Sequence, residues 1–159
     1  MGLTKPIELN LLSDQGTFMY LKNIIRGEKR MYEMKSEYYT GIELIDQEHA
    51  GLFHIADEAY TLLMDEFIVD KFDDIVAIIL RLRDYAVQHF KDEEEYMMSI
   101  GYKRLLSHKT EHTDFIEKVN SIDFESMDGN QTQALLDILE FLNDWLVHHI
   151  LEKDMLYMQ

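Results

Sequence analysis

Two pairs of potential metal ligands occur between positions 89 and 112 of this 159-residue chain. His89 and Glu93 are four residues apart, and so are His108 and His112. Residues four apart on an α-helix lie one above the other on the same face, so each pair can direct two ligand atoms at one point. This spacing is typical of metal ligands that a single helix presents.

Three more candidate ligands, His49, His149 and Asp154, lie on inward faces of other predicted helices. Nitrogen and oxygen ligands without sulfur favour iron, manganese or zinc, and the full set suits two metal ions with carboxylates as bridges. Unpartnered imidazoles are costly in a core, which favours a metal site over separate hydrogen-bonded histidines. Asp154 is about 140° around an ideal helix from His149, so it has to reach sideways or sit where the helix relaxes.

The remaining histidines, His54 and His148, fall off these inward faces. They lie about 140° and about 100° around their helices from His49 and His149, so we expect them at the surface or in an outer layer. The acidic run of residues 92, 94 and 95 is predicted to be a solvated face.

Hydrophobic periodicity predicts four helices that position these side chains. Apolar residues recur at steps of three and four along residues 46–66, along 70–100 until Gly101 stops the helix, along 102–120 and along 132–157. The links between them are short, and turn residues occupy 126–130. The predicted fold is all-α, an antiparallel up-down four-helix bundle.

Residues 1–40 are predicted to form an extra N-terminal helical arm, separate from a bundle domain at residues 41–159. Ser13 and Asp14 can cap a helix that runs to about Tyr38, although Gly16 and Gly27 weaken it. The arm contains none of the seven histidines. We interpret it as a segment that packs on the bundle, on a second subunit of a homo-oligomer or on a partner protein. A frayed extension is the alternative.

Composition excludes several classes of partner. The net charge of −16 argues against binding to nucleic acid or to an anionic membrane surface. The chain has no cysteine, which excludes disulfides and thiolate ligands and is compatible with a reducing compartment. The longest strongly apolar run, residues 75–80, is too short to cross a bilayer. We therefore expect a cytoplasmic protein.

The segments around the candidate ligands resemble those of the hemerythrin family, specifically the single-domain bacterial hemerythrins. The matching segments are GIELIDQEHAGLF, HFKDEEEYM, HKTEHTDF and WLVHHILEKD, and the resemblance covers residues 38–157. It implies two iron ions in an oxo- or hydroxo-bridged centre with one open position for dioxygen. The implied ligands are His108, His112 and His149 on one iron, His49 and His89 on the other, and Glu93 and Asp154 as bridges. Trp145 and Leu146 would wall the dioxygen pocket.

The leading functional hypothesis is reversible dioxygen binding for storage, transport or delivery, without catalytic turnover. The sequence has none of the Glu-x-x-His motifs of carboxylate-rich di-iron proteins, which favours binding over oxidation. Two alternatives remain: a sensor of oxygen, redox state or iron that signals through the arm, and a di-iron enzyme acting on peroxide or nitric oxide. Glu48 departs from the glutamine usual in the family and could alter hydrogen bonding around the centre.

Overall fold

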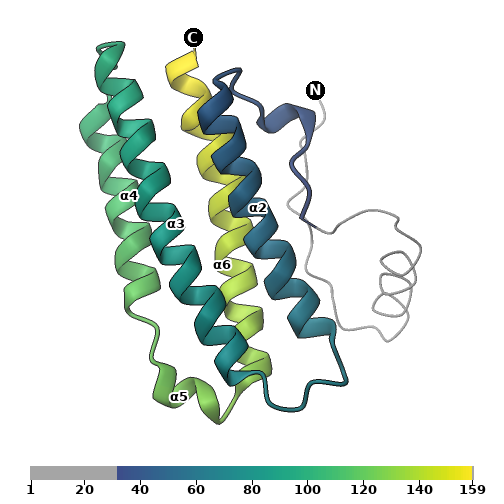
Figure 1. Ribbon diagram of the computed structural model, residues 1–159. Coiled ribbons are helices and arrows are strands. Elements are labelled where there is room, and N and C mark those ends of the chain that lie inside the picture. The colour runs from purple at the N-terminus through teal and green to yellow at the C-terminus, as the bar shows by residue number, and fades with distance from the viewer. Residues whose placement is uncertain (1–31, 159) are drawn as a thin grey trace.

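The computed structural model describes residues 32–158, and four long helices dominate it. The elements are η1 (Ser36–Tyr38), α2 (Glu43–Met64), α3 (Phe72–Ser99), α4 (Leu105–Asn120), α5 (Phe124–Asp128), α6 (Gln131–Glu152) and η2 (Asp154–Met158). The helices α2, α3, α4 and α6 run alternately up and down (Figure 1). The described residues contain no strand, so the prediction of an all-α bundle is confirmed.

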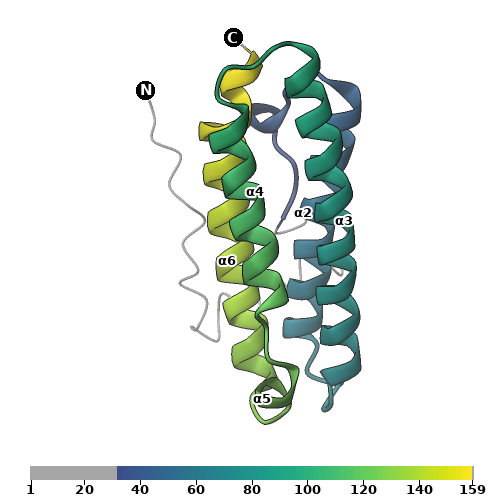
Figure 2. The ribbon, with the colours of Figure 1, turned by 90° about the vertical axis from the view of Figure 1, so that its left-hand side faces the viewer.

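The four long helices do not pack equally closely. The backbone of α3 packs against both α2 and α4, and α2 packs against α6. Helices α4 and α6 form one side of the bundle (Figure 2), yet they share few close backbone approaches. The seam between α4 and α6 is therefore the most open of the four.

A dry core fills the half of the bundle toward α5. The fully buried side chains there recur at steps of three and four along α3 and α6, among them Ile75, Ile79, Leu82, Leu135, Leu139 and Leu142. Burying one such side chain is worth about 1.5–3 kcal/mol, so these positions hold the helices together.

The end of α3 follows the prediction that Gly101 stops this helix. The helix ends at Ser99, and Gly101 has a φ of 65°, which a residue without a Cβ adopts at little cost. The N–H of Tyr102 donates to the carbonyl of Met97 at 2.9 Å, and that of Gly101 to Met98 at 3.1 Å. This pair of bonds is a Schellman motif that satisfies carbonyls at the helix end.

Helix α2 begins three residues earlier than the predicted start at residue 46. The first helical residue is Glu43, and Asp46 lies one turn inside. Its carboxylate accepts hydrogen bonds from the N–H of Thr40 at 2.6 Å, the hydroxyl of Thr40 at 2.8 Å and the N–H of Gly41 at 3.0 Å. Asp46 therefore fastens the preceding loop to the first turn.

The fourth long helix is shorter than predicted. Helix α6 ends at Glu152 instead of continuing to Tyr157, and the chain then tightens into the 3-10 helix η2 at Asp154. Asp154 thus sits where the helix relaxes, one of the two options that its spacing left open. The short helix α5 was also missed. It forms in the expected loop because Asp123 caps it by accepting from the N–H groups of Glu125 and Ser126.

Most of the predicted arm, residues 1–31, lies outside the described residues. The predicted α-helix that runs to about Tyr38 is wrong for residues 32–38. Only the short 3-10 helix η1 forms there. The N–H of Tyr32 donates to Asp57 at 3.3 Å, and its ring centre lies 6.1 Å from that of Tyr60. The division into arm and bundle domain remains a prediction. No helix of residues 32–158 is long and apolar enough to span a membrane.

Candidate metal centre

The structure brings all seven candidate ligands into one chamber. They come from the four long helices and from η2, and each is at most 4% exposed. The set comprises His49 of α2, His89 and Glu93 of α3, His108 and His112 of α4, His149 of α6 and Asp154 of η2. Residues separated by up to 105 positions in the sequence therefore surround one small volume.

Four of these side chains form a first group. The Nε2 atom of His149 lies 3.1 Å from that of His108 and 3.2 Å from that of His112. Glu93 Oε2 lies 3.1 Å from His112 Nε2 and 3.6 Å from His108 Nε2. The ligand atoms of all four lie within 4.8 Å of one another, a spacing at which they could bind one metal ion.

A second group consists of His49, His89 and Glu93, whose ligand atoms also lie within 4.8 Å of one another. The two imidazole rings meet edge to face with their centres 4.8 Å apart. His89 Nε2 lies 3.9 Å from Glu93 Oε2. Because Glu93 belongs to both groups, two metal ions bound here would be neighbours that share a carboxylate.

Asp154 also joins the two groups. Its Oδ2 lies 3.1 Å from His49 Nε2, while its Oδ1 lies 3.1 Å from His108 Nε2 and 3.0 Å from His149 Nε2. The turn of η2 brings the carboxylate inward after α6 has ended. Each buried carboxylate therefore faces imidazoles of both groups, as two bridging ligands would.

Both carboxylates remain ionised despite their burial. Burial and the charge of Asp154 act to raise the pKa of Glu93, but hydrogen bonds from His108 and His112 outweigh them and hold this pKa at about 2. Burial likewise acts to raise the pKa of Asp154. The charge of His149 and hydrogen bonds from three histidines nevertheless hold it well below its usual value. The chamber thus contains two negative charges that require positive charge beside them.

Two of the imidazoles, those of His89 and His108, show the complementary shift. Burial alone would lower the pKa of His108, but hydrogen bonds to Asp154 and Glu93 raise this pKa to about 9. The pKa of His89 is also raised, because its hydrogen bond to Glu48 and the nearby carboxylates outweigh burial. Protons on the imidazoles supply the positive charge when metal is absent. Metal binding would release them, since a coordinating imidazole must be neutral.

The residues present fit a pair of metal ions. Several buried polar atoms of residues 32–158 lack a well-formed hydrogen bond, and six of them belong to candidate ligands: both ring nitrogens of His49, His89 Nε2, Glu93 Oε2 and both carboxylate oxygens of Asp154. Buried polar atoms are rarely left unsatisfied unless an ion or water completes them. Except for His49 Nδ1, these six atoms lie 3.0–3.9 Å from an atom of another candidate ligand, and their nitrogen and oxygen chemistry suits iron.

Outer carboxylates orient three of the histidines. The Nδ1–H groups of His89, His112 and His149 donate to carboxylates at 2.9, 3.0 and 3.0 Å, and the acceptors are Glu48, Glu94 and Glu111 respectively. A proton held on Nδ1 leaves Nε2 free to bind metal, and such partners also raise the basicity of the imidazole.

The sequence identified only one of these outer partners. Glu48 was expected to affect hydrogen bonding around the centre, and it contacts His89. Glu94 was assigned to a solvated face, which is wrong, because its side chain is only 17% exposed and accepts from His112. Glu111 was not singled out. No sequence spacing reveals these pairs, because in each case the partners lie on different helices.

Tyr157 is a site residue that the sequence analysis missed. Its buried phenol donates a hydrogen bond of 2.5 Å to Glu93 Oε1. Burial and the charges of Glu93 and Asp154 raise its pKa, so the phenol keeps its proton. The signal that could have revealed it is its position three residues after Asp154, because side chains three apart are aligned on a 3-10 helix.

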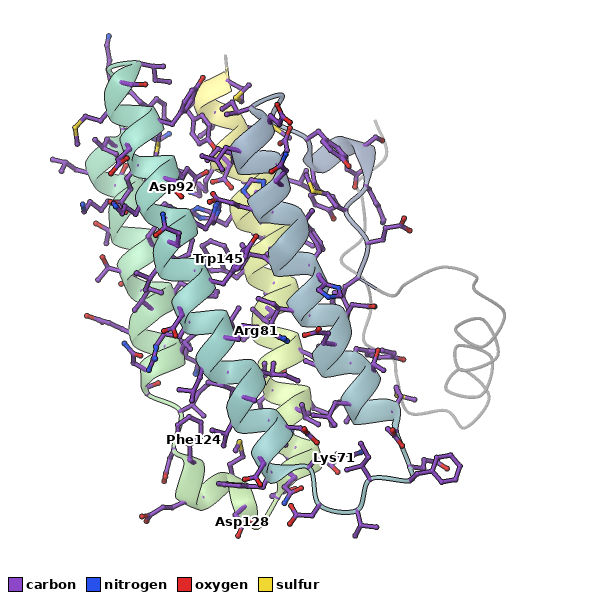
Figure 3. The ribbon with its side chains drawn as sticks, viewed as in Figure 1. Lys71, Arg81, Asp92, Phe124, Asp128 and Trp145 are labelled. Atoms are coloured by element: carbon purple, nitrogen blue, oxygen red, sulfur yellow. The ribbon has the colours of Figure 1, made fainter. Side chains whose placement is uncertain are left out.

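Aromatic rings cover the chamber on the side of α6. Trp145 stacks on His149, with ring centres 4.1 Å apart, and Phe90 stacks on His112 at 4.0 Å. Trp145 lies between the helices at mid-height (Figure 3), and Leu146 beside it is buried. Because Trp145 contacts the three-histidine group, its role in a dioxygen pocket at the other group remains a prediction. His54 and His148 are exposed and outside the chamber, as expected.

Comparisons with known proteins point to the same chemistry. The profile of the Hemerythrin HHE cation binding domain matches residues 40–159. The chain is 47% identical to a bacteriohemerythrin of Clostridium acetobutylicum over 127 residues, which cover 80% of this chain and 98% of that relative. It is 29% identical to a bacteriohemerythrin of Methylococcus capsulatus over 122 residues, covering 77% and 89%. It is 30% identical to a myohemerythrin of Theromyzon tessulatum over 127 residues, covering 79% and 90%.

The matched region contains every candidate ligand, and it begins at Thr40, where Asp46 fastens the chain to α2. A cation-binding profile agrees with a buried chamber that contains two ionised carboxylates. The similarity also extends over nearly the whole length of the relative from Clostridium acetobutylicum. On these grounds the chain belongs to the hemerythrin family.

Proposed function

We propose that this protein binds dioxygen reversibly at a non-heme di-iron centre, and so stores, carries or delivers it. The observation that carries this proposal is the chamber itself. Five imidazoles and two carboxylates meet there in two ligand groups that share Glu93, within a chain of the hemerythrin family. A di-iron centre, when bound, supplies an open coordination position and the two electrons that reversible dioxygen binding uses.

The proposed ligand assignment follows the two groups. His108, His112 and His149 would hold one iron, and their Nε2 atoms already lie 3.1–3.2 Å apart in successive pairs. His49 and His89 would hold the other iron, with Glu93 and Asp154 as bridges. One iron would thus have one imidazole fewer than its neighbour. That difference would leave an open position where a small ligand could bind.

The other residues of the chamber orient ligands and exclude water. Glu48, Glu94 and Glu111 hold imidazole protons on Nδ1, so the Nε2 atoms point inward. The phenol of Tyr157 donates a hydrogen bond to Oε1 of Glu93. The stacked rings of Phe90 and Trp145 keep water out of the chamber. A bound ligand is thereby protected from protonation by solvent, which would release it.

We infer that the protein binds dioxygen without turning over a substrate. The phenol of Tyr157 has a raised pKa and is engaged with Glu93, so it is a poor general acid. The outer carboxylates accept hydrogen bonds from the imidazoles, and the imidazoles keep the protons. We also propose that the protein works in the cytoplasm, which its lack of cysteine supports. The sensor alternative requires the arm, so deleting residues 1–36 should leave dioxygen affinity unchanged if that alternative is wrong.

An anaerobic iron titration followed by exposure to air tests the proposal. We expect binding to saturate at two irons per chain, followed by a visible absorption band on aeration that disappears when oxygen is removed. A colourless aerated protein, saturation at one iron per chain or a band that cannot be reversed would contradict reversible binding at a di-iron centre.

A further inference from the structure

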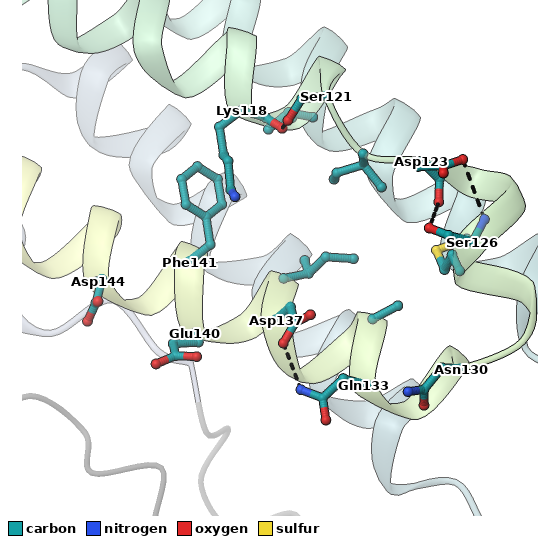
Figure 4. Close-up of a pocket in the computed structure, with 15 residues that line it drawn as sticks. Lys118, Ser121, Asp123, Ser126, Asn130, Gln133, Asp137, Glu140, Phe141 and Asp144 are labelled. Carbon is teal, nitrogen blue, oxygen red and sulfur yellow. Dashed lines mark hydrogen bonds between the residues drawn. The ribbon is translucent and has the colours of Figure 1, made fainter.

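A groove separates the end of α4 from α6 (Figure 4). Its volume is about 630 Å³, and it is lined by the last residues of α4, by α5 and by the first two-thirds of α6. It contains none of the seven candidate ligands. An inference about this groove therefore stands apart from the proposed function.

The floor of the groove is apolar and incompletely covered. Its buried members are Val119, Met127 and Ile138, and its partly buried members are Ile122, Ala134 and Phe141. Phe141 of α6 and Lys118 of α4 reach toward each other across the opening (Figure 4). A continuous apolar floor under an open seam indicates a surface that another segment covers.

The rim of the groove is acidic. Four carboxylates lie along it, those of Asp123, Asp137, Glu140 and Asp144, against the single ammonium of Lys118. Within residues 32–158, no basic side chain forms an ion pair with any of the four. The surface that would fit this groove is therefore apolar with basic edges.

The chain itself contains a segment of that character. Residues 1–31 have five basic and three acidic side chains, a net charge of +2, whereas the rest of the chain has ten and 28, a net charge of −18. A second bundle carries the same net charge of −18. Repulsion between the two bundles therefore disfavours their contact through this groove. Charge therefore favours the basic segment as the occupant.

The sequence pattern of this segment also matches the floor. Phe18, Leu21 and Ile25 follow one another at steps of three and four, so on the predicted helix they share one face. Lys22 and Arg26 each follow an apolar member by one position, which places them along the edge of that face. An amphipathic helix laid in an apolar groove is a common mode of peptide recognition.

Length and attachment are compatible with this arrangement. A helix over residues 14–31 would be about 27 Å long, and the α6 part of the groove, residues 130–144, spans about 21 Å. The segment continues into Tyr32, which is fixed to α2 through Asp57. η1 then contacts α6, the helix that also forms one wall of the groove. A segment tethered this close has an effective concentration of about a millimolar.

We propose that residues 1–31 dock in the α4–α6 groove of their own chain. The face of Phe18, Leu21 and Ile25 would cover the apolar floor, and Lys22 and Arg26 would face the acidic rim. The chain that contacts α2 through Tyr32 would then also lie along the α4–α6 seam.

Disulfide trapping tests this placement in the complete 159-residue chain, which has no cysteine of its own. Leu21→Cys combined with Ala134→Cys puts one thiol on the segment and one in the groove. The matched control combines Leu21→Cys with Val87→Cys, a position 51% exposed on α3. Under mild oxidation we expect the groove pair to form an intramolecular disulfide at least about tenfold faster than the control pair, measured by non-reducing electrophoresis and mass spectrometry.

A charge reversal adds a second readout. Asp137→Lys with Glu140→Lys in the groove-pair variant should slow trapping by about three- to tenfold, and salt should have a similar effect, because Coulomb attraction at an exposed rim is screened. The matched control reverses Asp84 and Glu95, both exposed on α3, and should leave the rate unchanged.

Three results would overturn the proposal: equal trapping rates for the groove and control pairs, a disulfide that joins two chains, and trapping that is insensitive to the charge of the rim. If the Ala134→Cys variant fails to fold, Gln133→Cys at the exposed rim replaces it, and the same outcomes apply.

Discussion

The same four helices enclose a polar interior in one half of the bundle and an aliphatic interior in the other. The half toward η2 surrounds five imidazoles and two carboxylates, whereas the half toward α5 contains aliphatic side chains such as Ile79, Leu82 and Leu139. The buried aliphatic side chains need no compensating charge. The polar half contains two buried carboxylates and needs positive charge, from protons or from metal.

A single helix shows how abruptly the interior changes. Along α3 the buried positions run from Ile75, Ile79 and Leu82 to His89 and Glu93 without a break in spacing. Periodicity decides only which face points inward. The chemistry of each buried face then decides whether packing or charge neutralisation stabilises that part of the bundle.

The largest expected effect is the loss of the metal centre through Asp154→Ala. This change removes the carboxylate that lies 3.0–3.1 Å from His49, His108 and His149, and so removes one of the two proposed bridges. We expect bound iron to fall from two per chain to one or none, with loss of the reversible visible band, measured by metal analysis and absorption spectroscopy.

His54→Ala is the matched control, because this exposed histidine pairs with Glu58 on its own helix and lies outside the chamber. It should retain two irons per chain. If Asp154→Ala also retained two, the polar half would not depend on its bridging carboxylate, and the proposed ligand set would be wrong.

The aliphatic half should respond in the opposite way. Leu139→Ala removes a fully buried side chain from that half and should lower the free energy of unfolding by about 2–5 kcal/mol. The folded variant should still bind two irons, because no candidate ligand is changed. Urea denaturation and metal analysis measure the two outcomes. A loss of iron from a variant that is still folded would show that the two halves are coupled.

The third effect concerns pH and the metal-free protein. The pKa of His108 is raised from 6.5 to about 9, so its contribution to stability is complete below pH 6.5 and is lost as the pH rises toward 9. The pKa of Glu93 is lowered from 4.5 to about 2, so its contribution is complete above pH 4.5 and is lost as the pH falls toward 2. Metal-free protein should therefore be most stable between pH 4.5 and 6.5.

Denaturation of metal-free protein across this range provides the measurement. Iron binding should shift the optimum upward, because coordinating imidazoles are neutral and metal replaces their protons. A flat profile for the metal-free protein would mean that the chamber is not held together by paired charges.

The smallest expected effect is that of Tyr157→Phe. Removing the phenol leaves Glu93 without its 2.5 Å hydrogen bond, and hydrogen bonds to charged groups are worth about 1.5–3 kcal/mol. We expect two irons to remain bound but to be released to a chelator about tenfold faster, consistent with the usual cost of losing an outer partner. Tyr96→Phe, a half-buried neighbour of the Tyr157 ring, is the control and should release iron at the unaltered rate. Equal release rates for both variants would show that Tyr157 does not stabilise the metal centre.

Local patterns explain why most of the centre was predictable. His89 with Glu93 and His108 with His112 are four apart on single helices, so their shared faces follow from helix geometry alone. The end of α3 at Gly101 was also predictable, because glycine adopts a positive φ at little cost. In contrast, the start of α2 was predicted too late, because Asp46 lies inside the helix and its carboxylate reaches back to Thr40 and Gly41. Helix α5 was missed because its cap lies within a turn.

The sequence alone determined four amphipathic helices and the inward position of five histidines, because side-chain periodicity is a property of each helix separately. Only the tertiary structure decided which atoms meet. It placed Glu94 and Glu111 behind imidazoles of neighbouring helices. It also tightened the chain after Glu152, so that Asp154 and Tyr157 turn into the chamber. These contacts join different elements, and their geometry exists only once the helices have packed.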